Sequence, residues 1–443
     1  MSLPREPTAT VQFVDQYCAY YQAVFPEVRS FEYFKYLHLG MIAELPRKTL
    51  PAIARAAGLE NEQPLHHFLA NSPWKAVDLR QKRLDLIIEV LHGRPLVLCM
   101  DETGDRKKGK TTDYVARQYI GNLGKIDNGL VSVNAYGLLG EITIPLVFEV
   151  FKPQKRLKEG DSYYSKPHLA VEMIQALQRR GFQFEVVLAD SLYGESSEFI
   201  NALSRLGLRY VVALRENHGV LLGPGQRVRY SRWKSFDRTF SNGEHEQRYI
   251  REIIFGRRGA VRYYHITTDV QEQPPESTWF IMTNLTGDIQ KEVGNTYGLR
   301  TWIEYGFKQI KDELGWADFR LTNYPEIEKW WEVVSSAYLM VSLQALHVTQ
   351  ASKSESFLNS HLGGSTTPAS SSKLDHSLFQ RHKWWDAGRG WKSMLNNLRL
   401  IIQPYVYYCL LAPWLQVFAI PSLHEGLLNL GARMNDFQGF IPV

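Results

Sequence analysis

The 443-residue chain is poor in cysteine and has no strong excess of charge of either sign. Its three cysteines, Cys18, Cys99 and Cys409, stand far apart, so they predict neither a zinc site nor a disulfide framework and favour a reducing, intracellular compartment. Lys and Arg number 51 against 46 Asp and Glu, which leaves a net charge of only +5. Affinity for a polyanion must therefore come from local basic patches.

Long hydrophobic runs without interruption are also missing. The first residues, MSLPREPTATVQ, lack the basic and apolar segments of a secretory signal. Residues 401–420 are uncharged and long enough to span a bilayer, but Pro404, Pro413 and two glutamines interrupt them. We therefore expect two buried helical segments there and no membrane partner.

The first 94 residues have helical patterns. Within them, Thr49 to Leu69 has the outline of a helix-turn-helix with a break at Gly58. Any small helical hairpin has the same outline, so the pattern alone does not establish a nucleic-acid contact.

From about residue 95, short apolar runs lead into acids. Leu96–Met100 predicts a buried strand that ends at Asp101, and residues 185–190 predict a second strand with Asp190 in the same position. The surrounding elements follow the order β-β-β-α-β-α-β, which predicts a mixed sheet with helices on its faces. Two acids at such an edge can share Mg²⁺ or Mn²⁺, although an acid at a strand end is often only a turn or helix cap.

Residues 297–316, YGLRTWIEYGFKQIKDELGW, carry a polar face beside an apolar stripe. On one α-helix, the charged and phenolic side chains would lie within roughly 40° of Glu304. This face is either an ordinary amphipathic surface with i,i+4 charge pairs, or a site in which an acid binds a metal and its neighbours bind phosphates. The side chains concerned are Tyr297, Arg300, Glu304, Lys308 and Lys311.

Together, these features resemble the DDE transposases of bacterial insertion sequences. The resemblance rests on the sheet order, on DETG and ADSLYG after two strands, and on the pattern Tyr-x2-Arg-x3-Glu-x6-Lys, and it covers residues from about 95 to 320. It implies an RNase H-like core that binds two Mg²⁺ or Mn²⁺ ions through a catalytic triad, Asp101, Asp190 and Glu304.

The resemblance also implies a set of DNA contacts. Tyr297, Arg300 and Lys311 would hold phosphates of the transposon end, whereas Lys308 shares their face but lies outside the signature. The basic segment after the first acid either lines the DNA path or is a solvated loop, and its candidates are Lys107, Lys108, Lys110 and Arg117. Trp279 either stacks on a flipped base or packs within a strand.

Residues 215–284 read as short strands with alternating basic and aromatic residues, among them Arg248 and Arg251. Such a run either tracks phosphates while stacking on bases or is ordinary strand alternation.

The predicted fold is α/β, with an RNase H-like mixed-sheet catalytic core interrupted by a β-rich insertion and flanked by helical N-terminal and C-terminal regions. The expected segments are a helical DNA-binding domain (1–94), the core in two parts (95–214 and 285–349), the insertion (215–284), a Ser/Gly-rich linker (350–378) and a helical C-terminal region (379–443).

The predicted activity is metal-dependent cleavage at transposon ends and strand transfer into target DNA. The partners expected are double-stranded DNA and a second copy of the chain in the DNA complex, in the cytoplasm at the nucleoid. Two alternatives remain open at this point: a transposase-derived DNA-binding regulator without catalysis, and a structure-specific nuclease with the same fold.

Overall fold

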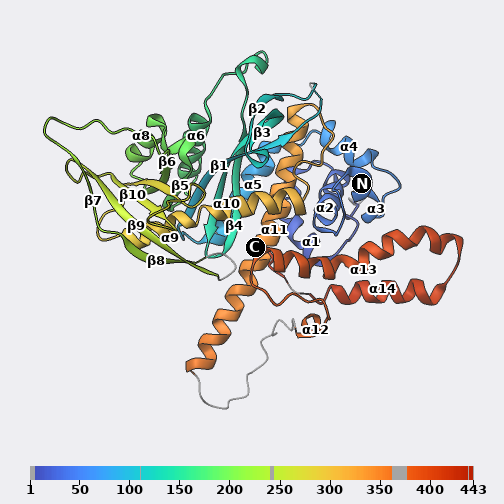
Figure 1. The fold of residues 1–443 in the computed structure, drawn as a ribbon. Coiled ribbons are helices and arrows are strands. Elements are labelled where there is room, and N and C mark those ends of the chain that lie inside the picture. The colour runs from blue at the N-terminus through green and yellow to red at the C-terminus, as the bar shows by residue number, and fades with distance from the viewer. Residues whose placement is uncertain (1–4, 110, 240–243, 362–376, 438, 443) are drawn as a thin grey trace. The chain divides into compact units, whose positions relative to one another are not determined.

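The computed structural model describes residues 5–109, 111–239, 244–361, 377–437 and 439–442 (Figure 1). The chain divides into two compact units. One unit runs from Ile88 to Phe307, and the other combines Met1–Ile87 with Lys308–Val443.

The Ile88–Phe307 unit is built on one mixed sheet, which has eleven strands among the described residues. Strand β5 is parallel to β1 and to β6, whereas β2, β3 and β4 join by antiparallel pairing. Helices α6 (Lys166–Arg179) and α8 (Ser197–Arg205) lie on the connections that parallel strands require. The first six strands are β1 (Leu96–Arg106), β2 (Ala116–Ile120), β3 (Lys125–Leu139), β4 (Ile142–Val150), β5 (Phe184–Ala189) and β6 (Tyr210–Leu214).

The β-rich insertion continues this sheet instead of forming a separate one. Strand β11 pairs antiparallel with β6, with Phe280 opposite Leu214, and β10 and β9 follow outward from it. Helix α9 (Gln290–Gly298) packs on β8 and β9. The strands are β7 (Val228–Tyr230), β8 (Lys234–Thr239), β9 (His245–Phe255), β10 (Arg262–Thr267) and β11 (Trp279–Thr283).

Strand β1 is longer than its apolar run predicted. The expected end of this strand at Asp101 is wrong, because β3 pairs with β1 as far as Arg106. The parallel pairing with β5, however, stops at Met100 and Ala189. Asp101 therefore lies at the end of the parallel ladder although it lies inside the strand.

The second unit is helical. Its long helix α11 (Tyr324–His361) packs against α2, α4 and α13, and it carries the buried Trp330 and Trp331. Trp331 stacks on Trp316 with 4.5 Å between ring centroids. The N-terminal helices are α1 (Gln12–Ala19), α2 (Val28–Ile42), α3 (Leu50–Ala56), α4 (Gln63–Ala70) and α5 (Ala76–Leu91).

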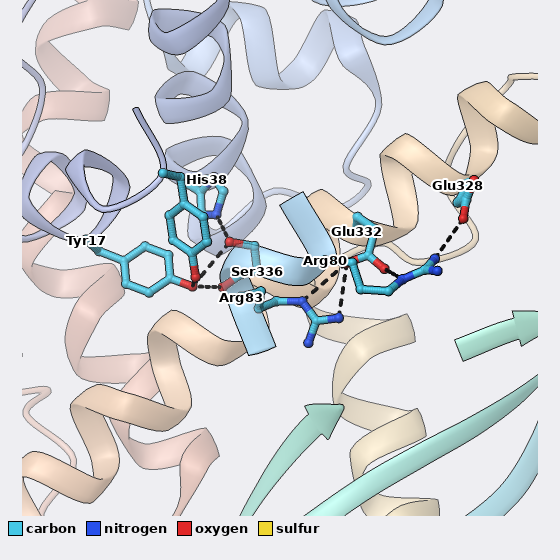
Figure 2. A network of polar contacts seen from close by, with 8 residues as sticks. Tyr17, His38, Arg80, Arg83, Glu328, Glu332 and Ser336 are labelled. Carbon is cyan, nitrogen blue, oxygen red and sulfur yellow. Dashed lines mark hydrogen bonds and ion pairs between the residues drawn. The ribbon is translucent and has the colours of Figure 1, made fainter. Parts of the chain in front are cut away.

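A buried polar network, here called the helical network, ties α1, α2 and α5 to α11 (Figure 2). Arg83 and Glu332 are fully buried and form an ion pair of 3.1 Å. Arg80 binds Glu332 at 2.5 Å and Glu328 at 2.8 Å. One turn further along α11, the Ser336 carbonyl accepts a 2.8 Å hydrogen bond from Tyr17, and the Ser336 hydroxyl lies 2.9 Å from Nε2 of His38.

The helix-turn-helix outline corresponds to α3 and α4, with Gly58 in a left-handed conformation at φ 74° between them. The expected linker begins inside a helix, because α11 continues to His361. Residues 362–376 of that linker lie outside the described residues.

The expectation of two buried helical segments within residues 401–420 is wrong. Helix α13 (Trp391–Val417) is continuous through Pro404 and Pro413, and α14 (Pro421–Met434) packs along it. Burial ends near Val406, and the side chains of α13 beyond it are partly or fully exposed. A proline removes one helical hydrogen bond, but here it does not end the helix. Among the described residues, α13 alone is long and apolar enough to cross a membrane, judged by length and composition only.

Candidate active site

Asp101 and Asp190 lie on adjacent strands at the point where parallel pairing stops. Met100 and Ala189 are the last paired residues of β1 and β5, and each is followed directly by one of these acids. Asp190 also caps the short helix α7 (Ser191–Gly194), because its Oδ1 accepts a 2.9 Å hydrogen bond from the Leu192 amide. The sheet therefore brings together the two acids that the sequence singled out.

Arg300 joins Asp101 to the third predicted acid. Its guanidinium donates from Nη1 to Asp101 Oδ2 at 2.9 Å and from Nη2 to Glu304 Oε1 at 2.5 Å. Arg300 and Asp101 are mostly buried, whereas the Glu304 side chain is 54% exposed. Glu304 is thus linked to the strand acids through an arginine, and within the described residues no group of three metal-binding side chains is arranged around one point.

The single helix expected over residues 297–316 is wrong. Helix α9 ends at Gly298, a turn contains Leu299 and Arg300, and α10 (Thr301–Lys308) carries Glu304. The turn makes hydrogen bonds between residues three apart, including Arg300 N to the Tyr297 carbonyl. It places Arg300 where its side chain reaches Asp101, a contact between distant segments that helical periodicity cannot reveal.

The end of the signature departs from an α-helix as well. Lys308 is the last residue of α10, and Lys311 lies in a π-helical segment, Gln309–Glu313. A π-helix bonds each residue to the one five positions away and has more residues per turn than an α-helix, so the α-helical spacing assumed for the signature does not apply at Lys311.

Two further charged side chains complete what we call the acid cluster. Glu102 follows Asp101 in β1. Lys166, in the first turn of α6, binds the Glu102 carboxylate at a distance of 3.0 Å. Sequence reasoning missed both, because Glu102 carries no periodic signal and Lys166 lies far away along the chain. The acid cluster has an excess of two negative formal charges, and its members are Asp101, Glu102, Asp190, Glu304, Arg300 and Lys166.

Burial of neighbouring carboxylates shifts their acidity. Burial raises the pKa of Asp101 to about 8, with Arg300 opposing this effect and Asp190 and Glu102 adding to it. The pKa of Asp190 is raised by burial and by the charge of Glu102. A cation beside both acids would reverse these shifts, because it favours their charged forms. Their oxygen atoms are the donors that Mg²⁺ and Mn²⁺ prefer, so this pair fits a divalent metal.

Tyr297 and Trp279 lie together next to the acid cluster. Tyr297 is buried, and its ring meets Trp279 edge to face at 5.4 Å. Two arginines cover Trp279, with guanidinium carbons 4.0 Å (Arg248) and 4.8 Å (Arg238) from the ring centroid. Both arginines are 4% exposed, so Arg248 does not follow a phosphate chain on the surface as its alternating pattern suggested.

The basic segment after the first acid forms part of a hollow in the surface. Lys108 and Arg117 line this hollow of about 660 Å³ together with Lys125 and Arg156, which sequence reasoning did not select. Lys107 lies beside it, and its amide bonds the Asn128 carbonyl at the end of the β1–β3 pairing. Lys110 lies outside the described residues. We call the set Lys108, Arg117, Lys125 and Arg156 the basic hollow.

Comparison with known proteins matches the chain to a class of DNA-cutting enzymes. Residues 24–235 match the family described as DDE superfamily endonuclease, and residues 165–340 match the transposase DDE domain. The chain is 56% identical over 329 residues to a probable transposase for insertion sequence element IS701 from Microchaete diplosiphon, covering 74% of this chain and 87% of that relative. It therefore belongs to the DDE transposases, which are divalent-metal-dependent endonucleases acting on DNA.

Proposed function

We propose that Asp101, Asp190 and Glu304 hold two Mg²⁺ or Mn²⁺ ions at which this transposase cuts transposon ends and joins the 3′-hydroxyls to target DNA. The observation that carries the proposal is the position of Asp101 and Asp190, side by side at the end of the β1–β5 pairing. Such ions polarise the scissile phosphate and activate the attacking water or 3′-hydroxyl. No covalent link between protein and DNA is then required.

The protein side chains have distinct tasks in this proposal. Asp101 and Asp190 supply rigid oxygen donors because each directly follows the last residue of the buried β1–β5 pairing. Arg300 keeps Glu304 near Asp101 and presents its guanidinium to the scissile phosphate, with buried Tyr297 beside it. Lys308 and Lys311 would bind phosphates further along the transposon end.

For Trp279, we propose that base stacking requires movement of an arginine. Arg248 and Arg238 already lie against the ring, so a flipped base competes with at least one of them. This contact favours the packing alternative over stacking in the DNA-free protein.

The basic hollow is the proposed DNA path, together with Lys107 and Lys110. Arg106, opposite Gly129 in β3, lies five residues beyond Asp101 along β1, and the hollow is lined by the adjoining residues Asp127 and Asn128. At about 3.4 Å per residue, the hollow is about 17 Å from the acids, a span of about five base pairs along a duplex. The substitutions Lys125→Ala and Arg156→Ala should each reduce the slope of log K for DNA binding against log salt concentration by about one. Unchanged salt dependence would remove the hollow from the path.

We further propose the regional roles expected from the sequence. Residues 1–94 bind DNA through the α3–α4 hairpin. The catalytic core is formed by residues 95–214 and 285–349, which flank the insertion at 215–284. The linker at 350–378 connects this core to the C-terminal region at 379–443.

A homodimer in the DNA complex is supported by α13 and α14, where large apolar side chains are exposed and acids are few. These exposed side chains include Leu410, Trp414, Val417 and Leu428. The place of action would be the cytoplasm, at the nucleoid.

The test uses duplexes that carry the terminal inverted repeats found beside the gene. With Mg²⁺, the protein should cut at the repeat ends, whereas Asp101→Asn and Glu304→Gln should bind the ends but leave them uncut. Full cutting by either variant would overturn the assignment. Cutting without preference for the repeats would support a structure-specific nuclease, and binding without cutting by the unaltered protein would support a regulator.

A further inference from the structure

Glu102 is a mostly buried carboxylate next to Asp101 in the sequence, and two other elements contact it. The Tyr193 hydroxyl donates to Oε2 at 3.1 Å, and the Lys166 ammonium donates to Oε1 at 3.0 Å. The side chains of Glu102 and Lys166 are each 17% exposed, and Tyr193 is fully buried. Each oxygen of this carboxylate therefore has a donor, and both donors come from helices.

Tyr193 connects Glu102 to Asp190. It lies on α7, whose first turn is capped by the Asp190 carboxylate. At the end of α7, a Cβ added to Gly194 would lie 1.9 Å from the Ala213 carbonyl oxygen of β6. The helix thus packs too closely on the sheet for any larger residue, and this contact fixes the position from which Tyr193 reaches Glu102.

We infer that Glu102 is a positioning residue that sets the spacing between Asp101 and Asp190 through its bond to Tyr193, while Lys166 balances its charge. The inference rests on the proposed metal-binding function. Pairing of β1 with β5 ends one residue before each acid. Just beyond that point, the hydrogen bond from Tyr193 to Glu102 joins α7, which Asp190 caps, to β1, which carries Asp101. This bond therefore restricts how far the two acids can separate.

Residues that orient metal ligands without touching the metal typically affect metal affinity by about 10-fold to 100-fold. We expect Tyr193→Phe to weaken Mn²⁺ binding by about 10-fold, because it removes one hydroxyl and keeps the buried ring. Glu102→Ala loses both contacts and should approach the 100-fold limit. Glu102→Gln keeps an oxygen acceptor for Tyr193 but loses its charge, so it should fall between the unaltered protein and Glu102→Ala.

The experiment measures Mn²⁺ binding to the full chain by electron paramagnetic resonance, together with the Mn²⁺ concentration that gives half-maximal cleavage. Thermal unfolding of each variant reports whether the fold is kept. Tyr163→Phe is the matched control, because it removes a hydroxyl from a tyrosine that is 48% exposed on the segment before α6. The expected result is a raised half-saturating Mn²⁺ concentration for Tyr193→Phe and Glu102→Gln, with cleavage restored at high Mn²⁺, and no change for Tyr163→Phe.

Unchanged Mn²⁺ affinity in a folded Glu102→Gln protein would overturn the inference, even if Tyr193→Phe did not fold. Loss of cleavage that high Mn²⁺ does not restore would also overturn it, because Glu102 would then act in another way. The proposed function fails separately, if Asp101→Asn binds Mn²⁺ as tightly as the unaltered protein.

Discussion

The helical network around Glu332 and the acid cluster around Asp101 both pair buried carboxylates with arginine, but they differ in charge balance. In the helical network, Arg80 and Arg83 face Glu328 and Glu332, so the formal charges cancel (Figure 2). The acid cluster contains four carboxylates and two cations, with Arg300 paired to Asp101 and Glu304 and Lys166 paired to Glu102. A balanced network holds helices together, whereas an acidic excess at a sheet edge costs stability that a bound cation would recover.

The largest effect on stability should come from the balanced network. Glu332→Ala leaves Arg83 buried without its carboxylate partner, so the free energy of unfolding should fall by about 3–5 kcal/mol. Chemical denaturation of the full chain measures this loss. A decrease below about 1 kcal/mol would mean that the network is not a main support of the helical unit.

The acid cluster should behave in the opposite way when charge is removed. Asp101→Asn should abolish cleavage yet leave the free energy of unfolding unchanged or higher at pH 8 without divalent metal, because it removes one of several repelling charges. Thermal unfolding in a chelator measures this difference. If Asp101→Asn destabilised the protein as strongly as Glu332→Ala, the distinction between the two clusters would be lost.

The pH dependence of the free energy of unfolding also distinguishes the acid cluster from the helical network, first through Asp101. Its pKa is about 8 in the folded chain against about 3.9 unfolded, so the folded state binds more protons between these values. Stability should therefore fall as pH rises from about 4 to about 8, by at most about 1.4 kcal/mol per pH unit. Without metal, Asp101→Asn should show a shallower fall across this range, and an identical slope would contradict the shifted acidity.

His38 in the helical network should give the opposite sign. Burial lowers its pKa to about 4, so the unfolded chain binds more protons between about pH 4 and 6.5. Stability should be lost as pH falls through this range. His38→Gln retains a side chain that can bond Ser336 without titrating, and its acid loss should be smaller. Equal losses in both proteins would show that other groups control acid unfolding.

The smallest effect is expected at the edge of the helical network. Glu328 is 25% exposed and binds only the outer side of Arg80, whose second carboxylate partner remains Glu332. Glu328→Ala should therefore cost about 1 kcal/mol or less. A loss as large as that of Glu332→Ala would show that the burial of these two carboxylates does not determine how much each contributes to stability.

The sequence predicted the parts of the site that local pattern determines. Asp101 and Asp190 follow apolar runs, and such runs indicate buried strands whose ends meet at one edge. The sequence did not predict that β1 continues through DETGDR, because these polar residues are held by pairing with β3 rather than by an apolar pattern. Local periodicity also suggested one helix through Arg300, which the turn at Leu299 and Arg300 replaces.

Contacts between distant residues were beyond pattern analysis. Glu102 and Lys166 lie 64 positions apart, and Arg248 covers Trp279 from β9, which is separated from β11 by β10 in the sheet. In α13, Pro404 and Pro413 predicted breaks, but the helix continues because losing one backbone bond does not outweigh the rest. The two side-chain contacts depend on which segments meet in the folded chain, whereas the continuity of α13 depends on the backbone bonds that the helix keeps.

The most direct test of the account is to locate Mn²⁺ by its anomalous scattering in crystals of the full chain bound to a transposon-end duplex. The account predicts an Mn²⁺ ion coordinated by carboxylate oxygens of both Asp101 and Asp190, and its loss in Asp101→Asn crystals. An Mn²⁺ ion bound elsewhere, in a complex that still cuts its DNA, would contradict it.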